Sequence, residues 1–154
     1  MRKGNLKDED WRGRLRERLR AFGYRLTPQR MRILETILEA GKGEHLTARE
    51  VYERVKRRDS NIGFATVYRA LELFTSLGLV NALNWGEGYY RYELSSDKPQ
   101  YHLVCMKCGK VMDGESPALN NLAKSIADEK SFSVVNLQLY LLGYCEKCRK
   151  EEGK

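Results

Sequence analysis

Two short runs decide the fold of the second half of this chain: His102-Leu-Val-Cys105-Met-Lys-Cys108-Gly109 and Cys145-Glu-Lys-Cys148. The chain has four cysteines, and all of them fall in these two Cys-x-x-Cys pairs. One such turn places two thiolates on an edge of a tetrahedron, so two turns complete a closed zinc site. Gly109 follows the first pair, where a residue without Cβ lets backbone amides turn toward the sulfurs. The pattern predicts a structural Zn²⁺ bound by Cys105, Cys108, Cys145 and Cys148.

Disulfides and a redox-active dithiol are the alternative interpretations of these cysteines. Disulfides need an oxidising compartment, and residues 1–10 lack the apolar core of a signal peptide. A thiol enzyme or redox switch needs a reactive thiolate, whereas a closed four-thiolate zinc site has no open coordination position. The sequence shows no Ser/His/Asp or Cys/His constellation. It therefore favours a protein that is not an enzyme, with a zinc/thiol redox switch as the alternative of another class.

Length and charge narrow the class further. At 154 residues the chain suits one domain or two small ones. Its formal charge of +7, from 28 Lys and Arg against 21 Asp and Glu, favours a polyanionic partner such as double-stranded DNA. No apolar run approaches the roughly 18 residues of a membrane span. We expect a cytoplasmic protein with neither a membrane partner nor a small-molecule substrate.

Helix signals fill the first half of the chain. Residues 8–22 place Trp11, Leu15, Leu19 and Phe22 on one face among many arginines, which predicts a basic amphipathic helix ending at Gly23. A second helix begins at Thr27-Pro28 and ends near Gly41. The run Thr47-Ala-Arg-Glu50 is a capping box that opens a third helix, and another helix runs from Gly63 to about Gly78.

A predicted hairpin follows these helices. Residues 79–84 and 89–94 read as short strands joined by a turn with two glycines, Trp85-Gly-Glu-Gly88. Helices followed by such a hairpin give the order of a winged helix-turn-helix, in which the helix after Gly63 enters the DNA major groove. Four side chains of this helix lie off its apolar stripe and can contact bases: Ala65, Thr66, Tyr68 and Arg69. The alternative interpretation is that they are ordinary solvent-exposed residues without a DNA contact.

The rest of the chain predicts a small second domain. Residues 95–101 read as a linker, followed by strands at 102–106 and 110–113. Ser116-Pro117 begins a helix expected to turn Leu119, Leu122 and Ile126 inward, and residues 132–142 read as one long strand with two apolar faces. So much apolar surface predicts a homodimer. The fold class is α+β: a winged helix at 1–94 including the basic helix, a linker at 95–101, and a small zinc-containing α/β dimerisation domain at 102–154.

The motifs together resemble the ferric uptake regulator family of metal-responsive transcription factors, which includes peroxide-sensing repressors. The matching stretches are Arg25-Leu-Thr-Pro-Gln-Arg30, His45-Leu-Thr-Ala-Arg-Glu-Val-Tyr52, Gly63-Phe-Ala-Thr-Val-Tyr-Arg-Ala-Leu71, His102 to Val111 and Leu139 to Cys145. The resemblance implies a homodimer that binds an AT-rich inverted repeat, usually as a repressor. It also implies DNA contacts from Arg25 and Arg30, and a second divalent metal between the domains that controls DNA-binding geometry.

By the same resemblance, four residues are candidate ligands of the second metal: His45, Glu93, His102 and Asp113. Asp113 falls where peroxide-sensing relatives add an aspartate, and Gln100 stands where family members commonly have a histidine, which leaves it a weak oxygen ligand. Imidazoles and carboxylates suit Fe²⁺, Mn²⁺ or Zn²⁺ without choosing among them. The alternative within the family is a constitutive DNA-binding protein whose regulatory site has decayed.

Overall fold

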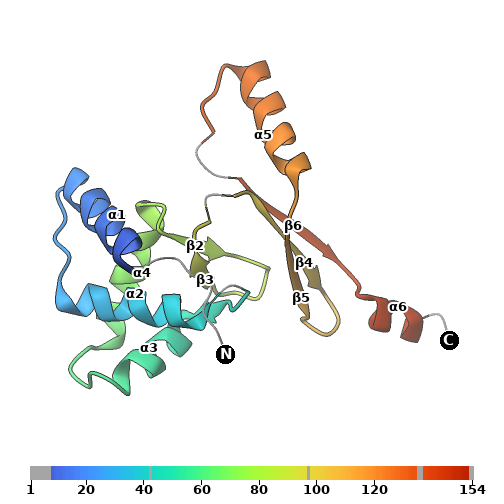
Figure 1. The fold of residues 1–154 in the computed structure, drawn as a ribbon. Coiled ribbons are helices and arrows are strands. Elements are labelled where there is room, and N and C mark those ends of the chain that lie inside the picture. Colours follow the sequence, from blue (N-terminus) through green and yellow to red (C-terminus); the bar gives the residue numbers. More distant parts are fainter. Residues whose placement is uncertain (1–7, 42, 97, 135–136, 153–154) are drawn as a thin grey trace. The chain divides into compact units, whose positions relative to one another are not determined.

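The computed structural model describes residues 8–41, 43–96, 98–134 and 137–152 (Figure 1). The chain forms two compact units, Met1–Ser95 and Ser96–Lys154. Within the described ranges, no helix has the length and apolar character needed to cross a membrane.

Helices make up most of the first unit. Its described residues form α1 (Asp8–Ala21), α2 (Pro28–Ala40), α3 (Ala48–Lys56) and α4 (Phe64–Ser76). The predicted start signals are confirmed, because Thr27 caps α2 with its hydroxyl on the Arg30 N–H and Thr47 forms a reciprocal capping box with Glu50 on α3. Each signal satisfies backbone donors that a helix start leaves without an intrahelical partner.

The core of the first unit collects one face from each helix. Fully buried side chains include Leu19, Ile33, Val51 and Phe74. Phe22, which the sequence places on the same helix face as Leu15 and Leu19, does not join this core, since its side chain is 63% exposed. The reason is local: α1 ends at Ala21 and the chain turns through Gly23 at φ 77°, so Phe22 leaves the buried stripe. The Trp11 side chain lies outside the described residues.

The wing is an antiparallel sheet of β1 (Leu46–Thr47), β2 (Val80–Leu83) and β3 (Arg91–Leu94) in the order β1-β3-β2 (Figure 1). The predicted β2–β3 hairpin is confirmed, although both strands are shorter than expected. Asn81 lies opposite Glu93 across the hairpin, and Arg91 pairs with Thr47 on the other side. The central strand therefore joins the hairpin to the residues that follow His45.

The second unit is a small sheet with two helices. It contains β4 (Gln100–Cys105), β5 (Val111–Glu115), α5 (Pro117–Lys130), β6 (Gln138–Gly143) and α6 (Glu146–Glu152). Strand β4 lies in the middle, antiparallel to β5 and parallel to β6. It begins at Gln100, inside the stretch expected to link the domains, because Gln100 pairs with both Glu115 and Gln138.

Two expectations for the second unit are wrong. Leu119 of α5 is buried, but Leu122 is 46% and Ile126 is 51% exposed. Residues 132–134 are not in a strand, residues 135–136 lie outside the described part, and β6 begins at Gln138. The chain reverses at Ser131 in the left-handed region, and strand pairing starts only opposite the first residue of β4. Much of the predicted core surface is therefore exposed within one chain.

Candidate metal centres and DNA-binding surface

The four cysteines come together at one end of the second unit. Cys105 ends β4, Cys108 follows in the turn, Cys145 follows β6 and Cys148 lies in α6. Their four Sγ atoms all lie within 4.8 Å of one another, and Cys108 and Cys145 are 3.8 Å apart. A tetrahedron with Zn–S bonds of about 2.3 Å has edges of about 3.8 Å. All four are free thiols without disulfides, so the donor set and its spacing fit a structural zinc ion.

The turn around Cys105 is shaped to stabilise thiolates. Gly109 adopts φ 71°, as expected for a position that favours glycine, and its N–H donates to the Cys105 carbonyl at 2.9 Å. Backbone N–H groups of Cys108 and Cys145 lower the pKa of the Cys105 thiol to about 6, whereas burial raises the pKa of Cys148 to about 12. A thiol with such a raised pKa loses its proton at neutral pH when a metal takes the proton's place.

A second group of candidate ligands lies in the first unit. His45 Nε2 is 3.1 Å from Glu93 Oε2, and Glu93 is only 7% exposed. The other oxygen of Glu93, Oε1, accepts a hydrogen bond of 3.3 Å from the Asn81 amide, whose own oxygen accepts one from Ser95. Asn81 therefore fixes the carboxylate that faces His45. No local sequence signal predicts this contact of Asn81, because it depends on the register of the hairpin.

The remaining candidate ligands lie in the second unit. His102 is 1% exposed, and its Nδ1 is 2.7 Å from Asp113 Oδ1 on the adjacent strand. Its ring stacks on Tyr140 of β6 at 5.5 Å. The carboxylate at Nδ1 orients the ring, so a metal bound by His102 would be bound through Nε2. Gln100 lies two residues before His102, which puts both side chains on the same face of β4.

The predicted base-reading helix presents the expected residues outward. On α4, Ala65, Tyr68 and Arg69 are exposed and Thr66 is half-buried, whereas Val67 and Leu71 enter the core. Exposed Phe64 begins this helix and meets the Tyr52 ring edge to face at 5.6 Å. Phe64 was not among the DNA-contacting residues predicted from the sequence. Its position directly after Gly63, at the start of the predicted base-reading helix, could have indicated it.

The other two predicted DNA contacts are Arg25, in the loop before α2, and Arg30, in the first turn of α2. Arg25 is exposed, whereas Arg30 is half-buried and lies over the Tyr24 ring at 5.7 Å. The Arg30 guanidinium donates to the Arg25 carbonyl at 2.6 Å. Arg30 therefore supports the loop that presents Arg25.

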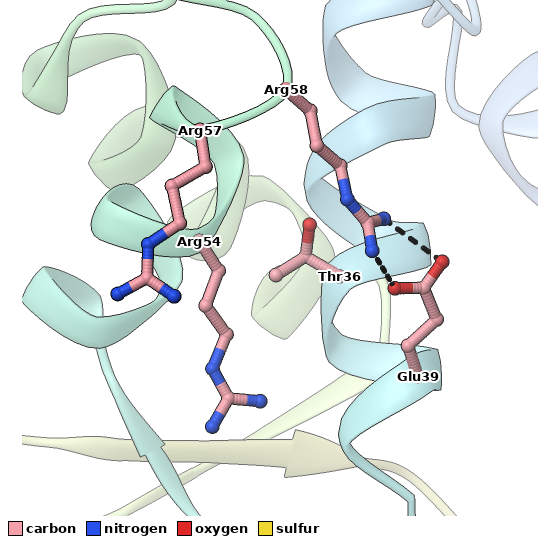
Figure 2. A pocket seen from close by; sticks show the side chains of 5 residues that line it. All are labelled: Thr36, Glu39, Arg54, Arg57 and Arg58. Carbon is pink, nitrogen blue, oxygen red and sulfur yellow. Dashed lines mark hydrogen bonds and ion pairs between the residues drawn. The ribbon is translucent and has the colours of Figure 1, made fainter.

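A surface pocket of about 250 Å³ lies between α2 and α3, lined by Thr36, Glu39, Arg54, Arg57 and Arg58 (Figure 2). Figure 2 shows Arg58 turned toward Glu39, with which it makes a two-point contact, while Arg57 points away from this pair. Arg54 is paired with Glu44. The arginines lie around the last turn of α3, where cations complement the helix dipole. We therefore attribute this pocket to the surface ion pairs Arg58–Glu39 and Arg54–Glu44 and do not assign it a ligand.

A winged helix-turn-helix followed by a small sheet unit with a four-cysteine cluster defines a class of metal-binding transcription regulators. Within that class, a sequence model of the Ferric uptake regulator family matches residues 21–142. The chain belongs to the ferric uptake regulator family. It is accordingly a DNA-binding, metal-responsive regulator of transcription, in a family of regulators rather than enzymes.

Named relatives show the breadth of the family. The ferric uptake regulation protein of Bacillus subtilis (strain 168) is 37% identical over 142 residues, which cover 90% of this chain and 95% of that protein. The peroxide operon regulator of the same organism is 35% identical, covering 89% and 92%. A structure of the ferric uptake regulator from Pseudomonas aeruginosa with manganese is 31% identical with a TM-score of 0.67, covering 82% of this chain and 95% of that one.

Proposed function

We propose that this protein is a homodimeric, metal-dependent repressor that binds an AT-rich inverted repeat. The observation that carries the proposal is that one unit holds both the His45–Glu93 pair and the exposed face of α4, which the sequence predicts to read bases. A metal bound by that pair is thus bound by the DNA-binding unit itself. Repression and the AT-rich repeat come from the family resemblance.

Arg69 and Tyr68 are the proposed readers of base edges, because both are exposed on α4. A guanidinium can donate two hydrogen bonds to one guanine, and aromatic and methyl groups such as those of Tyr68, Ala65 and Thr66 pack on thymine methyls. Arg25, exposed in the loop before α2, is the proposed contact to the DNA backbone or minor groove, with Arg30 behind it.

Two metal centres are proposed. Cys105, Cys108, Cys145 and Cys148 hold a structural zinc that ties the C-terminal helix to the sheet. His45 and Glu93 from the first unit, with His102 and its partner Asp113 from the second, form the regulatory site for Fe²⁺, Mn²⁺ or Zn²⁺, and Gln100 is a weak additional ligand. Because the ligands come from both units, metal affinity depends on their arrangement, and DNA and metal must strengthen each other's binding by the same factor.

The second unit is the proposed dimer interface. Its exposed apolar side chains include Ile126, Phe132, Leu141 and Leu142, all at least half exposed in the single chain. Exposed apolar surface of this kind marks a protein interface. The proposal predicts that the zinc-loaded protein sediments as a dimer, and that Leu142→Asp gives monomers.

The first test is selection of bound fragments from a randomised duplex pool by zinc-loaded protein. Parallel selections contain no added metal, Fe²⁺ under anaerobic conditions, Mn²⁺, or added Zn²⁺. Enrichment of one inverted repeat only with an added metal supports the proposal and names the metal. The same repeat without added metal identifies the constitutive alternative, and no repeat under any condition contradicts the DNA-binding assignment of α4.

A further inference from the structure

Three side chains of the wing, Trp85, Glu87 and Tyr89, surround the guanidinium of Arg91. Its Nε and one terminal nitrogen contact the two carboxylate oxygens of Glu87 at 2.7 and 2.9 Å. The Tyr89 hydroxyl donates to the same carboxylate at 2.9 Å and accepts from Arg91 at 3.2 Å. The guanidinium also lies 5.5 Å from the Trp85 ring centroid and 5.4 Å from that of Tyr89. A planar fork with two rings and a carboxylate around it is held in one orientation.

This wing cluster, Trp85, Glu87, Tyr89 and Arg91, reaches His45 by two routes. The Trp85 ring meets the His45 ring nearly edge to face, with centroids 5.0 Å apart and planes at 73°. The other terminal nitrogen of Arg91 lies 3.4 Å from the His45 carbonyl oxygen, a long contact. Arg91 pairs across strands with Thr47, which places it beside the chain just after His45.

His45 has a particular need for such support. It lies in the connection between α2 and β1, outside any helix or strand, and Gly41 and Gly43 in that connection both adopt positive φ. A glycine-containing connection restricts the backbone little, so packing around the ring must fix its orientation. Glu93 contacts one ring nitrogen, and the indole of Trp85 packs against the ring itself.

We propose that Trp85 and Arg91 are positioning residues that hold His45 in its metal-binding orientation, and that they thereby link the wing to the metal site. The inference rests on the proposed role of His45 as a metal ligand. Arg91 orders Trp85, and Trp85 sets the His45 ring. Residues that orient a ligand in this way typically contribute about 10- to 100-fold to metal affinity.

The test uses the zinc-loaded full chain carrying Trp11→Phe, which leaves Trp85 as the sole tryptophan. Co²⁺ is the probe, because its visible absorption reports coordination and it quenches a nearby indole. Absence of a thiolate-to-cobalt charge-transfer band shows that zinc still fills the cysteine site. In this parent we expect one Co²⁺ ion to quench Trp85, and His45→Ala to abolish that quenching.

The decisive variants are Arg91→Lys and the pair Trp85→Ala and Trp85→Phe. Lysine keeps the charge but loses the fork, so the Co²⁺ Kd should rise about 10-fold or more. Trp85→Ala should weaken Co²⁺ binding similarly, and in this variant binding is measured by Co²⁺ absorption. Trp85→Phe keeps an aromatic edge, so its Co²⁺ Kd should stay within about threefold of the parent value. Arg58→Lys is the matched control, since Arg58 also makes a two-point contact with a glutamate, Glu39, on a different surface.

The outcomes separate the two proposals. Co²⁺ binding that is as tight in Arg91→Lys and Trp85→Ala as in Arg58→Lys overturns the positioning role while leaving His45 as a ligand. No quenching of Trp85 in the parent, or unchanged binding in His45→Ala, contradicts the metal site itself. If Arg91→Lys loses the thermal transition of the folded protein, the comparison of Trp85→Ala with Trp85→Phe decides the question.

Discussion

Replacing Gly114 by alanine should perturb the second unit, although glycine there has an ordinary strand conformation. Gly114 lies in β5 directly after Asp113 and opposite Tyr101 of β4. A Cβ at this position would lie 2.2 Å from the Tyr101 ring and hydroxyl, far inside van der Waals contact. The Tyr101 ring occupies the space that a side chain at 114 would need, so it must move.

The loss of stability caused by Gly114→Ala depends on how far the Tyr101 ring can move. Overpacking a well-packed site typically costs about 1–3 kcal/mol. Tyr101 is only half-buried and can swing outward about its first side-chain torsion, so we expect a cost in the lower part of that range, about 1–2 kcal/mol. For a unit of this size, each kcal/mol lowers Tm by about 4–8 °C. The displaced ring also disturbs the strand next to His102.

The assay is thermal unfolding of zinc-loaded Gly114→Ala beside Gly143→Ala. Gly143 ends β6 in the same sheet, and an added Cβ there meets nothing within 4 Å. We expect Gly143→Ala to stay near the parent Tm and Gly114→Ala to fall clearly below it. Equal Tm values for the two variants would refute the argument that Tyr101 fills the space over Gly114.

Four further results are expected. Thr47→Ala removes the capping box of α3 and should lower the stability of the first unit by about 1 kcal/mol in denaturant unfolding, whereas Thr47→Ser retains it. Cys148→Ser removes a thiolate from the cluster. We expect this variant to lose its zinc to a chromophoric chelator and the second unit to unfold as the zinc is lost. Asn81→Ala removes the hydrogen bond that the Asn81 amide donates to Glu93 and should weaken Co²⁺ binding about 10-fold, which a titration would measure. Arg69→Ala should reduce the free energy of operator binding by about 1–3 kcal/mol and relax base preference at one operator position. Arg25→Ala should instead weaken binding to all DNA sequences and reduce the slope of log affinity against log salt concentration by about 1.

Local sequence signals predicted most of the secondary structure of the first unit. The capping box of α3, the Thr27-Pro28 start and the hairpin glycines each act through neighbouring backbone, so the sequence near Thr47 or Gly41 contains the cause of the structure there. The α4 surface was also predictable, because helical periodicity separates Val67 from Tyr68 and Arg69 without knowledge of the rest of the fold.

The second unit shows what such signals omit. The apolar residues of 132–142 read as one strand, but pairing with β4 fixes the start of β6 at Gln138. Amphipathic spacing in α5 predicted a buried face at Leu122 and Ile126, yet burial needs a covering surface, which a single chain does not provide there. Likewise Asn81 and Arg91 acquire their contacts from cross-strand register, which alternation alone does not specify.

The role of Asp113 in the proposed regulatory site also depends on a cross-strand contact. The family pattern suggests that it is a metal ligand, whereas the structure places its carboxylate 2.7 Å from His102 Nδ1. A carboxylate on one ring nitrogen fixes the tautomer and makes the other nitrogen a better ligand. Gln100, on the same face of β4, offers only a neutral amide, so a His102 ring held in orientation by Asp113 would partly offset that weak ligand. Asp113→Asn keeps an acceptor for the Nδ1 proton but removes the charge, and it should therefore retain metal binding with lower affinity. Complete loss of binding in Asp113→Asn with His102 intact would instead identify Asp113 as a direct ligand.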